Sequence, residues 1–413
     1  MKRFGWRLIA LVSAGVLSAC PKPAPAPPLT AEPEMRIGLA VGRDSVALGG
    51  DGELLLSDEE RGAPVGTIPG GGRWWVVPDT GGVRLVRPDG SRSARLGRAA
   101  AVNLTEGRFV MVNGRRYRGR VSLYRDAVGV TVVNQVPLES YVAGVVGHEI
   151  GTRRAEEREA VLAQAIVSRT YAVRNRGRWR TLGFDAHADV RDQVYTGVAG
   201  ETAAVWEAVR RTGGRIVRYR GEAIEAFFHS TCGYRTASVE EAFRTVGRRP
   251  YLRSVSDAAG GGRYYCERSP RFRWREEWDG PALRAILSRT LAPYADLSRD
   301  GLSRVRDLTV VSTTESGRVG ELRVAVATGD IRVPGVDVRD VLRAGDRPLW
   351  SAAFQLHVTH AGGEVSRVTA AGAGSGHGVG MCQWGAIGRA RAGQDHRRIL
   401  ATYYPGTTVD RIY

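Results

Sequence analysis

Residues 129–151 read GVTVVNQVPLESYVAGVVGHEIG, and they predict two kinds of secondary structure in succession. The Val-rich residues 129–134 predict a strand. Pro137 then begins a helix in which apolar residues recur at helical spacing. Gly151 is typical of a residue that ends a helix. A strand that leads into a helix within one short stretch favours the α+β class.

The same mixture of patterns extends in both directions along the chain. Strands are predicted at residues 121–124, 215–219, 223–229, 308–313, 322–327, 354–358 and 365–370. Helices are predicted at residues 155–174 and 202–211, after residue 281, and at residues 338–343, 386–392 and 395–403. With no fixed-period repeat, we expect an α+β protein of intermixed helices and antiparallel strands.

Before residue 120 the pattern is different. Short apolar runs at residues 37–41, 74–77, 83–86 and 109–112 are broken by Gly, Pro and Asp. This pattern predicts a small β-rich module over residues 35–119. Nothing in it is typical of catalysis, so we expect a structural or docking module.

Composition gives the class of protein but only weak information on its partner. The 413 residues are 43% hydrophobic and 25% charged, which is ordinary for a globular protein, but the net charge is +17. Basic proteins commonly meet nucleic acid, anionic membranes or acidic polymers. Lys2 and Lys22 are the only lysines, and an excess of arginine this strong can also come from GC-rich coding.

The N-terminus predicts export and lipidation. Basic residues precede the apolar residues 8–17, a stretch too short to span a membrane but suited to a signal peptide. It ends in Leu17-Ser18-Ala19-Cys20, which resembles a bacterial lipoprotein box. We therefore expect residues 1–20 to be a lipoprotein signal peptide, Cys20 to carry lipid, and the Pro-rich residues 21–34 to be a tether. The alternative is a plain secretory signal in which Cys20 stands by chance.

The predicted export also indicates where the protein is located and which partners it can meet. Residue 21 is Pro rather than Asp, which by resemblance to Gram-negative lipoproteins favours the periplasmic face of the outer membrane, if the source is Gram-negative. A lipid anchor would attach the chain to a membrane. An exported protein is unsuited to nucleic acid, so we expect no nucleic-acid partner despite the positive charge.

Glu149 is the first candidate for chemistry. It lies two residues before Gly151, in the last turn of the predicted helix, where the negative end of the helix dipole disfavours a charged carboxylate. The apolar residues before it favour desolvation, which acts in the same direction. A carboxylic acid that stays protonated near neutral pH can serve as a general acid. A solvated glutamate at a helix end explains the same pattern.

Two further segments combine polar side chains with glycine. In residues 227–236 (FFHSTCGYRT) a strand leads His229 into a polar turn, which fits a ligand-binding loop, half of a metal site or a capped strand end. Residues 376–386 (GHGVGMCQWGA) carry His377 and Gln383 among glycines, which let a backbone approach a ligand closely. A metal site at His229 lacks a second CxxC or HxxH pattern.

Taken together, these segments resemble a known family. The chain contains VPLESYVAGVVGHE (136–149), AQA and SRTYA (163–165 and 168–172), DQVYTG (192–197), HST (229–231), GHGVGMCQWGA (376–386) and YYPGT (403–407). Their order and spacing resemble the stage II sporulation protein D family, also called SpoIID/LytB-like. The resemblance covers roughly residues 121–413, so we expect residues 120–413 to form the catalytic region.

The resemblance implies a function. Characterised members are lytic transglycosylases that cleave the MurNAc–GlcNAc bonds of peptidoglycan, preferring strands stripped of stem peptides. The matching catalytic acid is Glu149, and no cofactor or metal is expected. The expected substrate contacts around a glycan-binding groove are Arg169, Tyr171, Gln193, Tyr195, His229, Ser230, His377 and Gln383. Arg169 could hold the lactyl carboxylate of MurNAc.

Two departures from the family pattern concern its lysine and its zinc. The family's Lys before AQA is Leu162 here. Some members bind zinc through a Cys/His cluster just before QVY, but residues 187–192 contain no cysteine, so we do not expect that site.

The remaining cysteines leave a choice of pairing. Cys232, Cys266 and Cys382 remain after lipidation, and a disulfide is common outside the cytoplasm. We expect a Cys232–Cys266 disulfide with Cys382 free, and a three-thiolate metal site is the alternative.

The sequence is compatible with three functions. The first is a peptidoglycan lytic transglycosylase that remodels the cell wall. The second is a non-catalytic peptidoglycan-binding protein or amidase activator, with an amidase as partner, which the loss of the lysine at Leu162 favours. The third, a wall-anchoring structural lipoprotein, leaves the clustered polar motifs unexplained.

Overall fold

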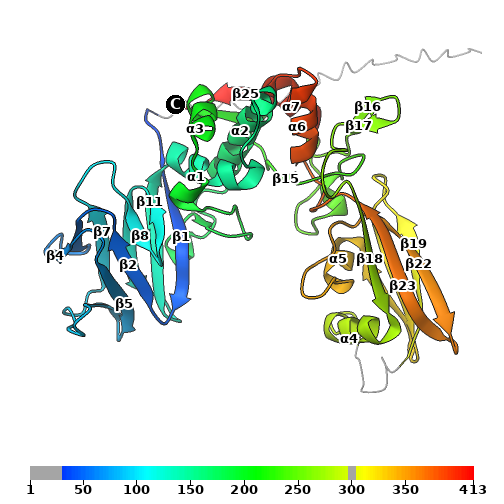
Figure 1. Cartoon of the computed structure of the whole chain (residues 1–413), viewed down its shortest axis with the longest axis horizontal. Helices are drawn as coiled ribbons and strands as arrows, with labels where there is room; N and C mark the ends of the chain where they lie inside the picture. The colour runs from blue at the N-terminus through cyan, green and yellow to red at the C-terminus, as the bar shows by residue number, and fades with distance from the viewer. Residues whose placement is uncertain (1–29, 296–303) are drawn as a thin grey trace, which may run out of the picture.

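The computed structural model describes residues 30–295 and 304–413 (Figure 1). The expected signal peptide, Cys20 and most of the tether lie outside these residues. The α+β class is confirmed, because helices and mostly antiparallel sheets share the chain. Figure 1 shows the helices α1, α2, α6 and α7 between the N-terminal strands and a second β-rich part formed by β18–β23. Among the described helices, none has the length and apolar character needed to cross a membrane.

The N-terminal part consists of two sheets. The seven-stranded sheet has the order β12-β1-β11-β10-β7-β3-β4, and the five-stranded sheet has the order β6-β5-β2-β8-β9. β7 pairs antiparallel with β10, so the larger sheet crosses the boundary expected near residue 119. The strands are β1 (Glu34–Arg43), β2 (Val46–Gly50), β3 (Leu54–Asp58), β4 (Pro64–Ile68), β5 (Arg73–Asp79), β6 (Gly82–Val86), β7 (Arg98–Asn103), β8 (Val110–Val112), β9 (Arg115–Tyr117), β10 (Arg120–Arg125), β11 (Val130–Pro137) and β12 (Ala186–His187).

β11 leads directly into α1 (Leu138–Ile150), as the sequence of residues 129–151 predicts, and the helix ends at Gly151 with φ 69°. α1 is apolar on most of its surface and is buried on several sides. Gly147 allows the closest approach, because a Cβ there would lie 1.5 Å from the carbonyl oxygen of Gly200. That contact allows α1 to pack closely against the 3₁₀ turn η3 (Gly197–Gly200).

α2 (Arg158–Arg174) is the centre of the helical part, where it contacts α1, α3, α6 and α7. A 3₁₀ turn, η1 (Ala155–Glu157), occupies the start of the helix predicted from residue 155. The other helices here are α3 (Ala203–Arg211), α6 (Gln383–Arg391) and α7 (His396–Tyr403). One continuous apolar core joins these helices to the N-terminal sheets, and Leu162 is buried within it. The position of the family's lysine is therefore a packing position in this chain.

The second β-rich part has its own apolar core, centred on residues such as Trp274, Leu322 and Val368. It contains the sheets β18-β23-β22 and β19-β20-β21. The helix and the four strands predicted beyond residue 281 are confirmed, whereas β18 and β21 were not predicted. The elements are β18 (Arg273–Asp279), α4 (Gly280–Thr290), β19 (Val305–Thr313), β20 (Val319–Val326), β21 (Gly329–Pro334), α5 (Val338–Val341), β22 (Phe354–Ala361) and β23 (Glu364–Ala373).

Short strands join segments that are far apart in the sequence. β15 (Phe228–His229) pairs in parallel with β24 (Met381–Cys382). β13 (Arg215–Tyr219) lies between β14 (Glu222–Ala223) and β25 (Thr408–Arg411). The single strand predicted over residues 223–229 is thus divided between β14 and β15. The β15–β24 pairing brings the His229 turn against the glycine-rich segment 376–386.

Candidate active site

An open cleft of about 750 Å³ lies at the end of α1. Its wall combines three acidic side chains, four arginines, aromatic rings and a histidine. The charged residues are Glu149, Asp192, Glu225, Arg178, Arg191, Arg249 and Arg339, and the ring-bearing residues are Tyr171, Phe227, Phe228, Phe243 and His377. Extended sugars bind through apolar ring faces and polar hydroxyls, so this wall fits a polar polymer with anionic groups.

Glu149 lies in this cleft, in the last turn of α1, as expected. Burial raises the pKa of its carboxyl, while the charge of His148 and hydrogen bonds from Gln383 and the Val194 backbone act in the opposite direction. The raised pKa favours the protonated form, which is the form that a general acid requires. His148 itself is exposed.

Two histidines beside the cleft are held neutral. Burial lowers the pKa of His229 and of His377 to about 3 in each case. The Nδ1 atom of His377 accepts the backbone N–H of Val379 at 3.1 Å, so in the neutral ring the proton is on Nε2. His377 lines the cleft, whereas His229 lies behind it with its ring centre 5.7 Å from that of His377. His377 is therefore suited to donate a hydrogen bond to a ligand rather than to carry charge.

Gln383 connects two of the motifs. Its Nε2 atom donates to the backbone oxygen of Glu149 at 3.0 Å and to Oε1 of Gln164 at 3.3 Å. The side chain is 8% exposed, so most of it is turned into the protein. Gln383 thus holds the end of α1, and its expected role as a substrate contact stays a prediction.

Tyr171 lies in the cleft, and its hydroxyl donates to Oδ1 of Asp192 at 3.3 Å. Asp192 also accepts from Nε1 of Trp179 and from the backbone N–H of His187, each at 2.8 Å. Asp192 stands directly before Gln193 in the DQVYTG block, which is a signal that could have identified it. The arginines of the cleft were not predicted, because arginine is common throughout this chain.

Like His229 and Gln383, three further expected contact residues do not line the cleft. Arg169 is fully buried and binds Glu139 through Nε at 2.8 Å, so its guanidinium is not free for a lactyl carboxylate. Gln193 is buried and accepts from the Tyr141 hydroxyl at 3.2 Å. Tyr195 is buried and donates to Asn134 at 2.9 Å. In the structure these three side chains pair with Glu139, Tyr141 and Asn134 and not with the cleft.

Ser230 and Cys232 follow His229 in the turn after β15, and Cys266 and Cys382 lie beside Cys232. The Ser230 hydroxyl is 3.3 Å from that of Thr231, and Ser230 does not line the cleft. The expected Cys232–Cys266 disulfide is not formed, since all three described cysteines are free and buried and these two sulfurs are 3.5 Å apart. The third thiol, Cys382, belongs to the same group.

The zinc position of some family members does not fit this chain. His187 has no cysteine beside it in sequence, and its ring packs between Trp179 and Phe184. Within residues 30–295 and 304–413, the group of side chains that could hold a metal ion lies elsewhere, at Cys232, Asp257, Cys266 and Cys382.

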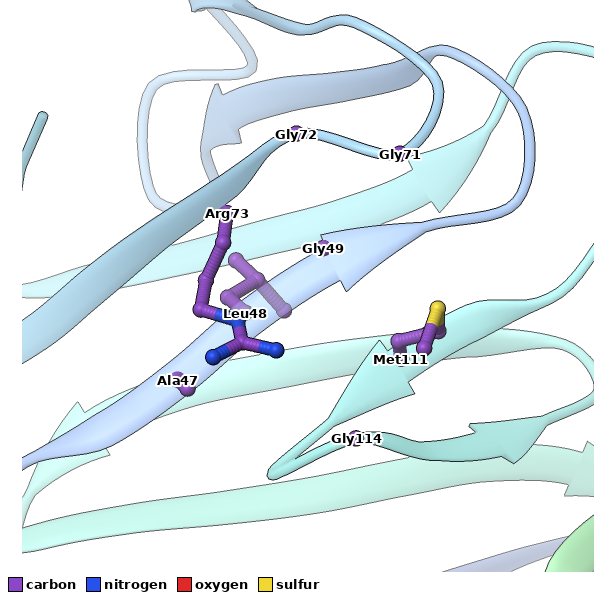
Figure 2. Close-up of a pocket in the computed structure, with 8 residues that line it drawn as sticks. All are labelled: Ala47, Leu48, Gly49, Gly71, Gly72, Arg73, Met111 and Gly114. Carbon is purple, nitrogen blue, oxygen red and sulfur yellow. The ribbon is translucent and has the colours of Figure 1, made fainter. Parts of the chain in front are cut away.

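A second hollow lies in the N-terminal sheets (Figure 2) and has a volume of about 40 Å³. It is lined mainly by backbone and apolar atoms around Gly49 and Met111, and Arg73 is its one ionisable residue. It lacks both the size for a sugar and an acid for catalysis. This hollow is therefore not a candidate for a catalytic site.

Comparison with known proteins identifies the family. The family model described as "Stage II sporulation protein" (SpoIID) matches residues 126–219, which contain α1, α2 and Glu149. The chain is 28% identical to stage II sporulation protein D of Bacillus amyloliquefaciens, over 76% of this chain and 88% of that protein. This chain belongs to the SpoIID family. The SpoIID match covers the strand, helices and motif residues that form one side of the cleft.

Two further relatives and a second family model also match this chain. It is 30% identical to an uncharacterized protein of Brachyspira hyodysenteriae, over 72% of this chain and 73% of that protein. It is 28% identical to the amidase enhancer of Bacillus subtilis over 61% of this chain, which spans only 38% of that relative. A second family model, a domain of unknown function (DUF8618), matches residues 263–380 and so covers the second β-rich part.

Proposed function

We propose that this protein cleaves peptidoglycan glycan strands by lytic transglycosylation, with Glu149 as the acid. The observation that carries the proposal is the carboxyl of Glu149, which lies in an open cleft and whose pKa is raised by burial. Membership of the SpoIID family and similarity to an amidase enhancer support a function connected with the cell wall.

The proposed reaction needs one acid. Glu149 donates its proton to the glycosidic oxygen as the bond from the MurNAc C1 atom to that oxygen breaks. The C6 hydroxyl of the same sugar forms the new bond to C1, and its proton passes to the Glu149 carboxylate. The products are a 1,6-anhydroMurNAc end and a free GlcNAc hydroxyl, and the acid is regenerated. A second carboxylate, which hydrolytic glycosidases require, is not needed.

The rest of the cleft fits this substrate. Phe227, Phe228 and Phe243 offer apolar faces to sugar rings, and Phe227 and Phe243 stack with ring centres 4.6 Å apart. Arg178 and Arg249 give the wall positive charge that suits the lactyl carboxylates of strands without stem peptides. Peptide-stripped glycan is therefore the proposed substrate.

Mass spectrometry of soluble products tests the activity. The purified full chain is incubated with intact sacculi and, separately, with amidase-stripped glycan. We expect anhydroMurNAc products from the stripped glycan with the natural chain and none with Glu149→Gln. Glu156→Gln is the matched control, because it makes the same change at an exposed glutamate outside the cleft.

A non-catalytic role is the second candidate, which the similarity to an amidase enhancer favours. In that case neither substrate would yield anhydro products. The natural chain and Glu149→Gln would co-sediment equally with the glycan, and both would stimulate an added peptidoglycan amidase. That pattern would overturn the transglycosylase proposal.

We also propose that the chain is an exported lipoprotein, anchored through Cys20 and facing the cell wall. The support is the basic and apolar sequence before Leu17-Ser18-Ala19-Cys20 and the Pro-rich stretch after it. Metabolic labelling with radioactive palmitate should mark the natural chain and not Cys20→Ser. A plain secretory signal would leave both chains unlabelled and both exported.

A further inference from the structure

A group of four buried side chains lies behind the cleft, apart from the residues assigned to glycan cleavage. Cys232, Asp257, Cys266 and Cys382 each place one ligand atom within 4.8 Å of the other three. They come from the turn after β15, from two points of the loop that follows it, and from the start of α6. Each is buried, with an exposed fraction of 0%.

The distances match those around a shared ion. The Cys232 Sγ atom is 3.5 Å from the Cys266 Sγ atom and 3.5 Å from the Oδ2 atom of Asp257. Thiolate donors at about 2.3 Å from a tetrahedral zinc ion lie about 3.8 Å from one another, and a carboxylate oxygen lies slightly closer. The four ligand atoms thus need only small shifts to surround one ion.

Other groups hold the donors in place. The backbone N–H groups of Cys232 and Gly385 both donate to the Sγ atom of Cys382 at 3.2 Å. Asp257 accepts from the Tyr403 hydroxyl at 2.7 Å and from Arg389 at 3.2 Å through Oδ1, which leaves Oδ2 facing the sulfurs. Partners of this kind orient metal ligands in known sites.

The glycine at position 385 belongs to the same arrangement. A Cβ at Gly385 would lie 2.0 Å from the Tyr403 hydroxyl oxygen and 2.7 Å from Oδ2 of Asp257. Only glycine leaves room for the carboxylate and its tyrosine to approach the start of α6.

The charges also favour a cation. Three thiolates and one carboxylate carry four negative charges, and a divalent ion with Arg389 and Arg318 would balance them. Arg318 donates to the backbone oxygen of Cys232 at 3.4 Å and forms no carboxylate ion pair among the described residues. A Cys232–Cys266 disulfide would leave Cys382 and Asp257 facing an uncharged bond.

We propose that Cys232, Asp257, Cys266 and Cys382 bind one zinc ion in a closed, structural site. Sulfur-rich tetrahedral donors favour zinc over magnesium or calcium, and four protein ligands leave no position for a reacting water. The ion ties together the His229 turn, the loop carrying Cys266 and the start of α6, which carries Gln383. It is separate from the Glu149 chemistry and does not rest on the proposed transglycosylase activity.

Metal content and cobalt spectra test the site without any activity assay. The full chain is purified without reductant, incubated with Zn²⁺ or Co²⁺, and desalted. We expect one equivalent of bound metal, and for cobalt the intense visible bands of a tetrahedral thiolate site. Cys232→Ser and Cys382→Ser should lose both signals. Ser269→Ala should keep them, because Ser269 lies in the same loop and contacts Thr231 but is not a ligand.

A milder variant keeps the test decisive if the cysteine variants do not fold. Tyr403→Phe removes the hydroxyl that donates to Asp257 and accepts from Nε of Arg389 at 3.3 Å, and it should weaken zinc affinity by about 10- to 100-fold in competition with a chelator. Alkylation of the unfolded natural chain, with no reductant, should modify all three cysteines. A Cys232–Cys266 disulfide in that sample, or a natural chain that takes up no metal, would overturn the proposal.

Discussion

At the scale of single residues, Glu149 shows how position creates reactivity. It is placed at the end of an apolar helix and in a cleft wall, so burial raises the pKa of its carboxyl. The neighbouring charge of His148 only partly offsets this effect. The carboxyl therefore keeps its proton to a higher pH than an exposed glutamate does, at some cost to the folded state once the proton is lost.

We expect Glu149→Gln to abolish most of the activity without lowering the stability of the protein. A carboxyl whose pKa is raised on folding contributes stability below its unfolded pKa, and that contribution is lost as the pH rises through the folded value. Glutamine has no such dependence, so the variant should melt at an equal or higher temperature than the natural chain at pH 8. The difference should disappear near pH 4. Cleavage should fall by about 10²- to 10⁴-fold.

Thermal melts followed by circular dichroism across this pH range measure the first effect. A Glu149→Gln chain that is less stable than the natural chain at pH 8 would contradict it, since the carboxylate would then be stabilising. Glu156→Gln serves as the control, with no change of melting temperature at either pH.

Arg169 illustrates the opposite case, a motif residue used for packing. Although burial opposes it, the hydrogen bonds and charge of Arg169 hold the pKa of Glu139 below its usual range. We expect Arg169→Met to lower the free energy of unfolding by about 3–5 kcal/mol in urea titrations, because it leaves Glu139 unpaired. Adding Glu139→Gln should recover part of the loss.

A substrate-binding role for Arg169 would give a different result. The single variant would then remain stable and show a raised KM on stripped glycan. The sequence could not distinguish these outcomes, because an arginine within a helix looks the same whether it faces a cleft or a partly buried glutamate 30 residues earlier.

At the scale of elements, the start of α6 determines how the acid is held. Gln383 is the first residue of α6 and reaches the backbone oxygen of Glu149 at the end of α1. We expect Gln383→Ala to lower kcat by about 10- to 100-fold through a small displacement of the acid, with little change in KM. Kinetics on stripped glycan across pH measure this, and the alkaline limb of the profile should shift as well.

Gln394→Ala is a suitable control for that variant, because Gln394 follows the same helix and bonds to Tyr265 rather than to α1. An increase in KM with an unchanged kcat in Gln383→Ala would instead support the original expectation that Gln383 contacts the substrate.

Individual helices were predictable from the sequence, but the pairing of distant short strands was not. Pro137 and Gly151 mark the bounds of α1, and the apolar spacing of α2 identifies it, because these signals act within a few residues. The β15–β24 pairing joins His229 to Cys382 across 153 positions of the chain. Two residues in each strand give no periodic pattern, so the sequence indicates the two loops but not that they meet.

At the scale of the whole molecule, the family motifs lie around the helical part, whereas the apolar packing divides the chain into two cores. The motifs surround the helical part, yet the chain between HST (229–231) and GHGVGMCQWGA (376–386) leaves it and returns. That excursion contains β18–β23 with a core of its own. Strands within it were predicted, but a separate core depends on which strands pair, which periodicity alone does not reveal.

Two separate cores predict two unfolding transitions. Leu322 is fully buried in the core of the second β-rich part, and Leu162 is 1% exposed in the core shared by the helices and the N-terminal sheets. Either leucine changed to alanine should lose about 2–5 kcal/mol in the core that holds it. In calorimetry, Leu322→Ala should lower one transition and Leu162→Ala the other, because the two cores share no buried residue.

Hydrogen exchange assigns the transitions to their parts of the chain. In Leu322→Ala, the amides of β19 and β20 should exchange faster while those of α1 and α2 keep the rates of the natural chain. Because Arg339 of α5 lines the cleft, glycan cleavage should weaken at temperatures where the second β-rich part has already loosened. A single transition that moves by the same amount in both variants would show that the cores unfold as one unit, and that the excursion is needed to hold the His229 turn and the glycine-rich segment together.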